Sequence, residues 1–176
     1  DSAGESNWIS VMFTQPQSAK ADTHRGGPDS ALAEAIGAAR SSVDVCIYHL
    51  ELWSLRNALI QAHQRGVRVR VITESDYLDE PAIQALVSAG IDVQGDGRDS
   101  LMHNKFAIID EHVVWTGSMN WTLEGAYHND NNLIQVRSSR LAKNYTTEFE
   151  EMFTHGLFGN HIAAHTPQTT LTKDNT

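Results

Sequence analysis

Helical periodicity and β-rich runs alternate along the first half of the chain, and this alternation restricts the fold more than any other feature of the sequence. Asp29 is the predicted N-cap of the first helix, in which apolar residues recur at helical spacing up to Arg40. Three helix–strand pairs are predicted, at 29–40 and 43–50, at 55–64 and 67–72, and at 81–89 and 91–93. Such a series builds an α/β domain whose sheet contains parallel strands.

The remaining elements are mostly strands, and they extend the same domain. Strands are predicted at 8–13, 105–109, 113–116 and 133–136, and a last helix at 141–153. The chain of 176 residues has room for one substantial core, so 1–158 is predicted to be a single domain. The segment 159–176 is rich in Thr, Gln and Asn, and we expect a flexible tail or the start of a missing second half.

Composition narrows the class of protein. No apolar stretch approaches the roughly 20 residues that a membrane span needs. The formal net charge of −9 is unlike the basic stripe of proteins that bind DNA through its phosphates, so any nucleic-acid site must be locally basic. The single cysteine, Cys46, lies in an apolar run and is predicted to be a buried, inert thiol. Because the chain opens at Asp1 without Met, we expect a secreted or periplasmic protein.

One predicted strand carries a pair of residues that suits a phosphate. His103 and Lys105 are two residues apart, so their side chains point to the same face, and an imidazole and an ammonium converge on one anion. Asp110 has the opposite parity and lies at the predicted turn. Strand geometry therefore favours an architectural role for Asp110 over that of a third catalytic group.

A second group of polar residues follows the next predicted strand. Gly117 permits close backbone approach, and the hydroxyl or backbone N–H of Ser118 is able to bond a phosphate oxygen. Asn120 adds an amide donor two residues later. Each of these features is common by itself, but the combined spacing His-x-Lys-x4-Asp-x6-Gly-Ser-x-Asn is specific.

This spacing matches the signature of the phospholipase D superfamily without a gap. The chain most resembles the compact, single-motif members, which are bacterial endonucleases and mitochondrial Zucchini-type proteins, roughly from Asp29 to Phe153. The resemblance implies an α/β fold with a mixed sheet flanked by helices on both faces, and no metal or other cofactor. It also implies an active site that needs two copies of the motif related by a twofold axis. A homodimer with both His103 side chains at that axis supplies the second copy.

The resemblance implies a role for each motif residue as well. His103 becomes the nucleophile that forms a phosphohistidine, while His103 of a second copy protonates the leaving oxygen and later activates water. Lys105 and Asn120 bind the nonbridging oxygens of the phosphate, and Ser118 supports the phosphate or the partner histidine. Asp110, which the motif groups with the catalytic His103 and Lys105, takes an orienting or structural role.

One position departs from the family pattern. The family often has a Glu-Asn pair after the Gly-Ser segment, and this chain has Asn131-Asn132 in register. Asn132 therefore fits as a supporting residue, whereas Asn131 departs. If the Glu orients the catalytic histidine, then either the neighbouring Asp130 replaces it or that support is weaker in this chain.

Several residues near the motif have two interpretations. His49, at the end of a predicted strand, either faces the site or takes a core or sheet-edge position, the second being favoured. Trp115 and Trp121 either stack on bases or anchor the turn as hydrophobic residues, the second again being favoured. Arg68 and Arg70 alternate with valines, which is typical of a solvated strand face, although they also offer a local basic patch.

The resemblance fixes the reaction more firmly than the substrate. We expect a metal-independent phosphodiesterase, and the small size and single motif favour an endonuclease with single-stranded DNA or RNA as substrate. The alternative is a phospholipase D or cardiolipin hydrolase that acts on phospholipid, if an apolar loop such as the one with Leu52 and Trp53 meets the membrane. Two further alternatives are a noncatalytic phosphate-binding scaffold and one half of a longer two-motif enzyme.

Overall fold

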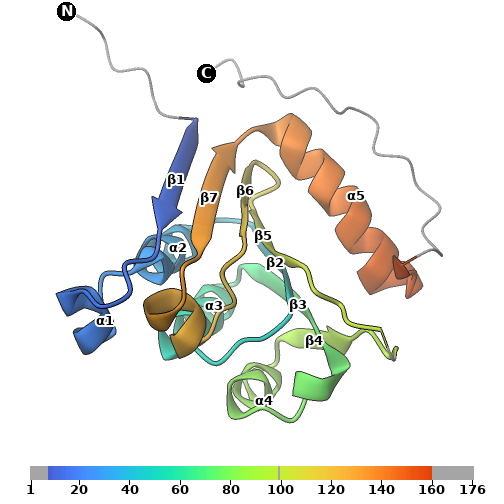
Figure 1. The fold of residues 1–176 in the computed structure, drawn as a ribbon. Coiled ribbons are helices and arrows are strands. Elements are labelled where there is room, and N and C mark those ends of the chain that lie inside the picture. The colour runs from blue at the N-terminus through green and yellow to red at the C-terminus, as the bar shows by residue number, and fades with distance from the viewer. Residues whose placement is uncertain (1–7, 99, 160–176) are drawn as a thin grey trace, which may run out of the picture.

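The computed structural model describes residues 8–98 and 100–159, which form one mixed sheet with helices on both faces (Figure 1). The strands are β1 (Ile9–Phe13), β2 (Ser42–Ile47), β3 (Arg68–Thr73), β4 (Asp92–Gly95), β5 (Lys105–Ile109), β6 (Val113–Gly117) and β7 (Asn132–Arg137). Their spatial order is β1-β7-β6-β5-β2-β3-β4, with β2, β3 and β4 parallel and the other neighbours antiparallel. The expected α/β class with a mixed sheet is confirmed.

The helices form two unequal layers. They are α1 (Ala19–Thr23), α2 (Pro28–Gly37), α3 (Trp53–Gln64), α4 (Pro81–Ser88) and α5 (Ser139–His155), with the short turns η1 (Ser75–Tyr77) and η2 (Glu124–His128). The helices α2, α3 and α4 cover one face of the sheet, and α5 crosses the other (Figure 1). The sequence did not predict α1, η1 and η2, because elements this short show no helical period. Of the tail expected at 159–176, all but Gly159 lies outside the described residues.

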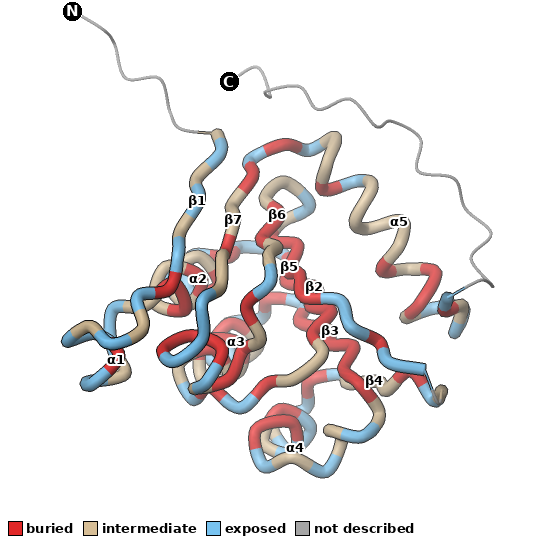
Figure 2. Tube along the Cα trace, viewed as in Figure 1, coloured by how far each residue is buried: buried red, intermediate tan, exposed pale blue. Residues whose placement is uncertain are grey.

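Strand β2 runs through the centre of the core. All six of its residues are buried (Figure 2). Val43, Val45 and Ile47 pack in the apolar layer under α2 and α3, whereas Cys46 points to the layer under α5. Burial raises the pKa of the Cys46 thiol, so the prediction of a buried, unreactive cysteine agrees with its surroundings.

Strand direction gathers the motif segments at one end of the sheet. In antiparallel neighbours the last residues of one strand lie beside the first residues of the next. The carboxyl ends of β2 and β6 therefore adjoin the amino ends of β5 and β7, as the pairs Ile47–Lys105 and Gly117–Leu133 show. Because β3 runs parallel to β2, η1 follows at the same end. We call this the site end of the sheet.

The structure corrects the predicted N-cap of α2. Gly27 is the N-cap and Pro28 takes the first helical position, where its missing N–H costs nothing. The carboxylate of Asp29 instead accepts hydrogen bonds from Ser54 Oγ and from the Tyr127 hydroxyl, each at 2.7 Å. Asp29 thus ties α2 to α3 and to η2, which borders the site end.

The structure also corrects the expectation for Arg70, which lies neither on a solvated strand face nor in a basic patch. Its side chain is 12% exposed, and its guanidinium pairs with Asp44 at 2.8 Å and with Glu150 of α5 at 2.7 Å. Arg68, which is half exposed, also reaches Asp44, at 3.4 Å. Because α5 covers this face of the sheet, Arg70 is paired within the domain and is not available to a nucleic acid, whereas Arg68 stays half exposed.

Candidate active site

His103 and Lys105 meet at the site end around one aromatic ring. Lys105 begins β5 and is 9% exposed, and its Nζ donates to the backbone oxygen of His103 at 3.0 Å. The same Nζ lies 5.1 Å from the centre of the Tyr48 ring, a cation–π distance. The exposed ring of His103 lies edge-on to Tyr48, with centroids 4.7 Å apart. Tyr48 follows β2 directly and is fixed by its N–H, which donates to the Asn104 oxygen at 2.9 Å.

The surroundings of this pair favour a neutral imidazole beside a cation. Desolvation, and after it the positive charge of Lys105, lowers the pKa of His103 below its ordinary value. Burial lowers the pKa of Lys105 as well. A neutral imidazole has a free lone pair on one ring nitrogen, which is what a nucleophile needs.

Replacing Lys105 by methionine is expected to raise the pKa of His103 toward its ordinary value of about 6.5, because the ammonium charge is removed. The rise should be partial, since the desolvation remains. A pH titration of the His103 ring by NMR measures it. Lys143→Met, on the exposed face of α5, is the matched control and should leave the His103 pKa in place. An unchanged His103 pKa in Lys105→Met contradicts this electrostatic coupling.

The Gly-Ser segment is shaped by close contact between β6 and β7. A side chain at Gly117 would collide with the backbone oxygen of Asn132, and its φ of 153° is one that L-residues rarely adopt. The Ser118 hydroxyl donates to Asn131 Oδ1 at 2.8 Å and accepts from the Asn132 N–H at 3.1 Å. Ser118 therefore holds the loop together through both asparagines, and Asn132 contacts it through the backbone N–H and through the side-chain amide, at 3.3 Å.

Asn131 has its own structural task at the position where the family often has Glu. Besides accepting from Ser118, its amide donates to the Gly125 backbone oxygen at 2.9 Å, which ties the β6 loop to η2. These bonds suit an amide, because a carboxylate has no N–H to donate. Asp130 is exposed, and no contact places it against His103.

A cavity of about 340 Å³ opens beside Ser118 and Asn120. Tyr48 also lines it, so the cavity adjoins the ring that contacts His103 and Lys105. Asn120 Oδ1 is buried and has no hydrogen-bond partner among the described residues. The structure thus brings His103, Lys105, Ser118 and Asn120 to the site end, in agreement with the motif.

Asp110 is the one motif residue that the structure does not bring to the site. It follows β5, at the opposite end of that strand from Lys105. Its carboxylate accepts hydrogen bonds from the backbone N–H groups of Arg40, Ser41 and Ser42, at 2.7–3.1 Å, and from the Ser41 hydroxyl at 2.9 Å. Asp110 fixes the turn that leads into β2, so its placement corresponds to the architectural role and not to a catalytic one.

Sequence reasoning missed the aromatic cluster behind the motif. The Tyr48 and Tyr77 rings meet edge to face, and their hydroxyl oxygens are 3.3 Å apart. The His49 ring stacks on Tyr77, with centroids 4.0 Å apart, and lines the cavity. His49 therefore faces the site, contrary to the favoured interpretation. The only available signal was the position of Tyr48 and His49 at the end of the predicted strand 43–50.

The two tryptophans near the motif are structural. Trp115 is 3% exposed and Trp121 is 1% exposed, so both belong to the core and neither is able to stack on a base. The Trp121 backbone pairs with the segment after β2, since its N–H donates to His49 oxygen at 3.1 Å. This agrees with the favoured interpretation of the tryptophans as hydrophobic anchors.

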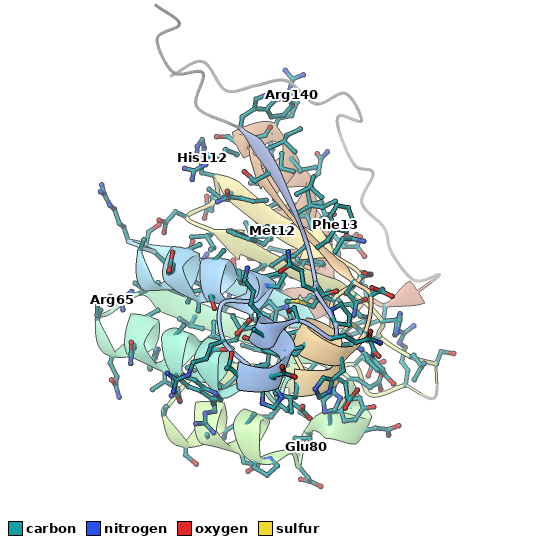
Figure 3. All side chains as sticks on the ribbon, turned by 60° about the vertical axis from the view of Figure 1, so that its left-hand side comes forward. Met12, Phe13, Arg65, Glu80, His112 and Arg140 are labelled. Carbon is teal, nitrogen blue, oxygen red and sulfur yellow. The ribbon has the colours of Figure 1, made fainter. Side chains whose placement is uncertain are left out.

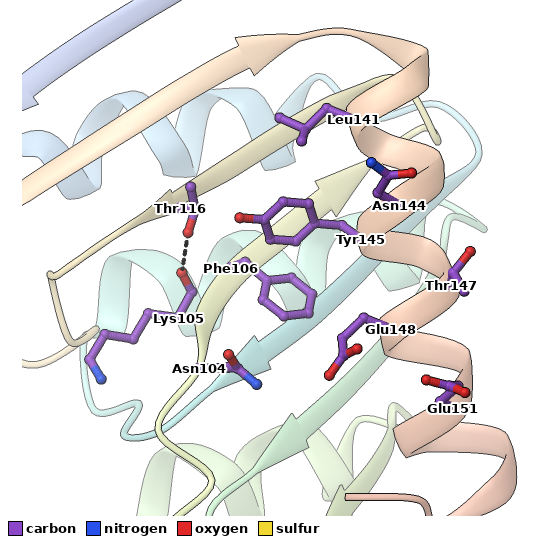
Figure 4. A pocket seen from close by; sticks show the side chains of 10 residues that line it. All are labelled: Asn104, Lys105, Phe106, Thr116, Leu141, Asn144, Tyr145, Thr147, Glu148 and Glu151. Carbon is purple, nitrogen blue, oxygen red and sulfur yellow. Dashed lines mark hydrogen bonds between the residues drawn. The ribbon is translucent and has the colours of Figure 1, made fainter. Parts of the chain in front are cut away.

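A second cavity, of about 320 Å³, lies between α5 and strands β5 and β6 (Figure 4). Figure 4 shows that the backbone of Lys105 borders this cavity while its ammonium points away from it. Glu148 and Glu151 also line it, and desolvation raises the pKa of Glu148. Carboxylates repel a phosphate, so this cavity suits an anion less well than the side of Lys105 to which the ammonium points. Within 8–98 and 100–159, no three His, Cys, Asp or Glu side chains are grouped to hold a metal ion.

Comparison with known proteins places this site in a family. The family model described as "Cardiolipin synthase, PLD-like domain" matches residues 32–153. Mitochondrial cardiolipin hydrolase of Xenopus laevis is 40% identical over 124 residues, which are 69% of this chain and 59% of the relative. The Homo sapiens protein of the same name is 40% identical over 126 residues, which are 70% of this chain and 50% of the relative. The chain thus spans between half and three fifths of the length of these two relatives.

Solved structures of the same fold include two bacterial proteins. The phospholipase D family member Nuc from Salmonella typhimurium has a TM-score of 0.70 at 21% identity, over 83% of this chain and 93% of Nuc. NucT from Helicobacter pylori has a TM-score of 0.62 at 18% identity, over 83% of this chain and 96% of NucT. The fold and the His-x-Lys site define a phospholipase D-like domain. The chain belongs to the phospholipase D superfamily, in the family of the cardiolipin synthase PLD-like domain.

Proposed function

We propose that this chain is a metal-independent phosphodiesterase that cleaves its substrate through a covalent phosphohistidine at His103. The observation that carries the proposal is that the His103 imidazole and the Lys105 ammonium lie together against Tyr48. The lowered pKa of His103 favours the neutral form that a nucleophile needs. A neutral imidazole attacks phosphorus directly, so the nucleophile needs no metal-bound water. Lys105 and the Asn120 amide stabilise the negative charge that grows on the nonbridging oxygens.

The reaction has two displacement steps. A ring nitrogen of neutral His103 bonds to phosphorus, the P–O bond to the leaving alcohol breaks, and a second histidine, which starts in its protonated form, gives that alcohol its proton. The second histidine then takes a proton from water, the hydroxide attacks phosphorus, and the P–N bond breaks. The products are an alcohol, a phosphomonoester and neutral His103.

The second histidine is proposed to come from another copy of the chain. The sequence has one His-x-Lys pair, and a twofold dimer presents the same surface from both subunits at one axis. The His103 side chain is exposed, as it must be to reach such a seam. A second motif elsewhere in a longer polypeptide serves the same purpose chemically.

Single-stranded nucleic acid is the proposed substrate. Aromatic residues line the cavity beside the phosphate-binding groups, and bases stack on such rings with little regard to sequence. The net charge of −9 opposes the extended phosphate contacts that binding of a duplex requires. This charge opposes binding of a single strand less, because the bases of a single strand can be held apart from the phosphate backbone. The likeness to Nuc shows the fold alone and is consistent with this proposal.

Phospholipid is the second candidate substrate, favoured by one surface feature. On the edge strand β1, the side chains of Ile9, Val11 and Phe13 are 40%, 51% and 69% exposed and lie on one face. Figure 3 shows Met12 and Phe13 on this strand. Phe13 pairs with Asn132, so the apolar strip ends at the site end. The two relatives named mitochondrial cardiolipin hydrolase also favour a phospholipid substrate.

The loop that was considered for membrane contact offers less apolar surface. Of its residues Leu52 and Trp53, only Trp53 is exposed.

Cleavage of single-stranded DNA or RNA is expected to continue in EDTA, because His103 itself is the nucleophile. The purified protein is incubated with single-stranded DNA, duplex DNA, RNA and cardiolipin vesicles, with and without EDTA. Activity that EDTA abolishes and Mg²⁺ or Zn²⁺ restores overturns the mechanism. Release of phosphatidic acid from the vesicles without cleavage of any nucleic acid identifies phospholipid as the substrate.

A further inference from the structure

The cavity beside the phosphate-binding groups has a defined chemical character. Tyr48, Ser118 and Asn120 are among the residues that line it, so a substituent of a phosphorus held at His103 and Lys105 is able to extend into it. Its volume of about 340 Å³ is at the small end of the range for ligand pockets and fits a single base with its sugar. A role for this cavity in binding a base depends on the proposed nucleic-acid function.

One wall of the cavity is aromatic and held in place. Tyr48 and Tyr77 meet at an interplanar angle of 89°, and His49 backs Tyr77 with its ring nearly parallel, at 2°. The hydroxyl contact between Tyr48 and Tyr77 raises the pKa of Tyr77 to about 12, so Tyr77 stays neutral. Rings fixed by their neighbours lose little entropy when a flat ligand stacks on them.

Two exposed glutamates, Glu51 and Glu124, also line the cavity and form its acidic rim. The Oε1 atom of Glu51 accepts a hydrogen bond from the Leu123 N–H at 2.6 Å. The Oε1 atom of Glu124 lies 3.0 Å from His128 Nδ1, so both carboxylates are held in place. Both line the cavity with Asn129 and Asn131, and no Lys or Arg is among the described residues that line it. Such a rim disfavours a second phosphate and favours an uncharged group with N–H donors.

Two polar atoms in the wall point to a polar ligand independently of the rim. His49 Nε2 and Asn120 Oδ1 are buried and have no hydrogen-bond partner among the described residues. A buried polar atom that is left without a hydrogen-bond partner is destabilising. A ligand that carries both donors and acceptors, as a base does on its edge, has the groups that these two atoms lack as partners.

We infer that this cavity binds the base of the nucleotide next to the scissile phosphate and prefers bases that carry an exocyclic amino group. Glu51 and Glu124 accept from that amino group, as carboxylates do from cytosine N4 in nucleic-acid recognition. Uracil presents a carbonyl oxygen at the same position, which faces the carboxylates with like partial charge.

The test compares two substrates that differ only on this edge of the base, where cytosine has an amino group at C4 and an acceptor at N3, and uracil a carbonyl at C4 and an N–H at N3. Single-stranded oligomers of deoxycytidine and of deoxyuridine have the same length, charge and ring size. The wild-type chain should cleave the deoxycytidine oligomer with a kcat/KM on the order of tenfold higher, as one good hydrogen bond gives. Bis(p-nitrophenyl) phosphate, which has no base, reports the chemistry alone.

The matched variants remove two negative charges each. Glu51→Gln with Glu124→Gln keeps both anchoring acceptors but weakens the bond to an amino group, since charge-assisted hydrogen bonds are about twice as strong as neutral ones. The cytosine preference should fall to about threefold or less. Glu34→Gln with Glu111→Gln, at exposed positions on α2 and the β5–β6 turn, should retain it.

Three outcomes overturn the inference in distinguishable ways. Equal cleavage of the two oligomers, or a preference that survives in the cavity variant, removes the base site and leaves the nuclease proposal standing. If the control variant also loses the cytosine preference, the preference depends on the net charge of the protein and not on the cavity. Cleavage of bis(p-nitrophenyl) phosphate with no cleavage of either oligomer removes the base site and the nucleic-acid substrate together.

Discussion

Replacing His103 by alanine is expected to lower kcat/KM on bis(p-nitrophenyl) phosphate by at least about 100-fold, because the nitrogen that bonds to phosphorus is removed. The fold should be unaffected. The His103 side chain is exposed and contributes to neither apolar cluster, so the thermal unfolding midpoint should stay within about 2 °C of the wild-type value. Initial rates and thermal unfolding followed by circular dichroism measure both.

The control for this variant is His63→Ala, on α3 and away from the site end, which should keep wild-type rates. Wild-type turnover in His103→Ala refutes the assignment of the nucleophile. Mixing with excess His103→Ala chains tests the dimer as well. If each site needs two histidines, activity falls with the square of the wild-type fraction after subunit exchange. A linear fall means that one motif is sufficient.

Asp110→Ala is expected to lower the free energy of unfolding by about 2–3 kcal/mol, since the loss leaves the N–H groups of Arg40, Ser41 and Ser42 without their acceptor. Molecules that fold should keep kcat close to the wild-type value, because Asp110 lies at the far end of β5 from Lys105. Urea unfolding and initial rates separate the two effects. Asp92→Ala, an exposed carboxylate on β4, is the control and should cost no more than about 0.5 kcal/mol.

The stabilisation by Asp110 should depend on pH with a definite sign. Burial acts to raise the pKa of this carboxyl, but the hydrogen bonds from the segment 40–42 outweigh it, so the pKa is lowered overall. A lowered pKa in the folded state means that the contribution is complete above the ordinary carboxyl pKa of about 4 and is lost as the pH falls through the folded-state value. The stability gap between wild type and Asp110→Ala should therefore narrow in acid. A loss of kcat at neutral pH that matches His103→Ala contradicts the architectural role.

The local elements and the motif were readable from the sequence for a physical reason. Apolar residues at periods of 3.6 and 2 report which face of an element is buried, and this gave every strand and each helix of eight residues or more. The His-x-Lys spacing places two side chains on one strand face whatever the rest of the fold does. The opposite parity of Asp110 likewise gave its architectural role before its partners at 40–42 were known.

Only the tertiary structure decided which distant segments meet. The sequence alone predicts a solvated Arg70, because no local pattern shows that α5 packs over β3 and supplies Glu150. In the sequence, Asn131 is only a departure from the family pattern, because its partners, Ser118 and the Gly125 oxygen, come from other segments of the chain. The ring of Tyr48 between His103 and Lys105, with Tyr77 and His49 behind it, joins three strand ends. Periodicity reports the environment of each residue, whereas the pairing of strands determines its neighbours. The sequence by itself therefore determined the family and the His-x-Lys pair, and the fold determined the cavity beside them.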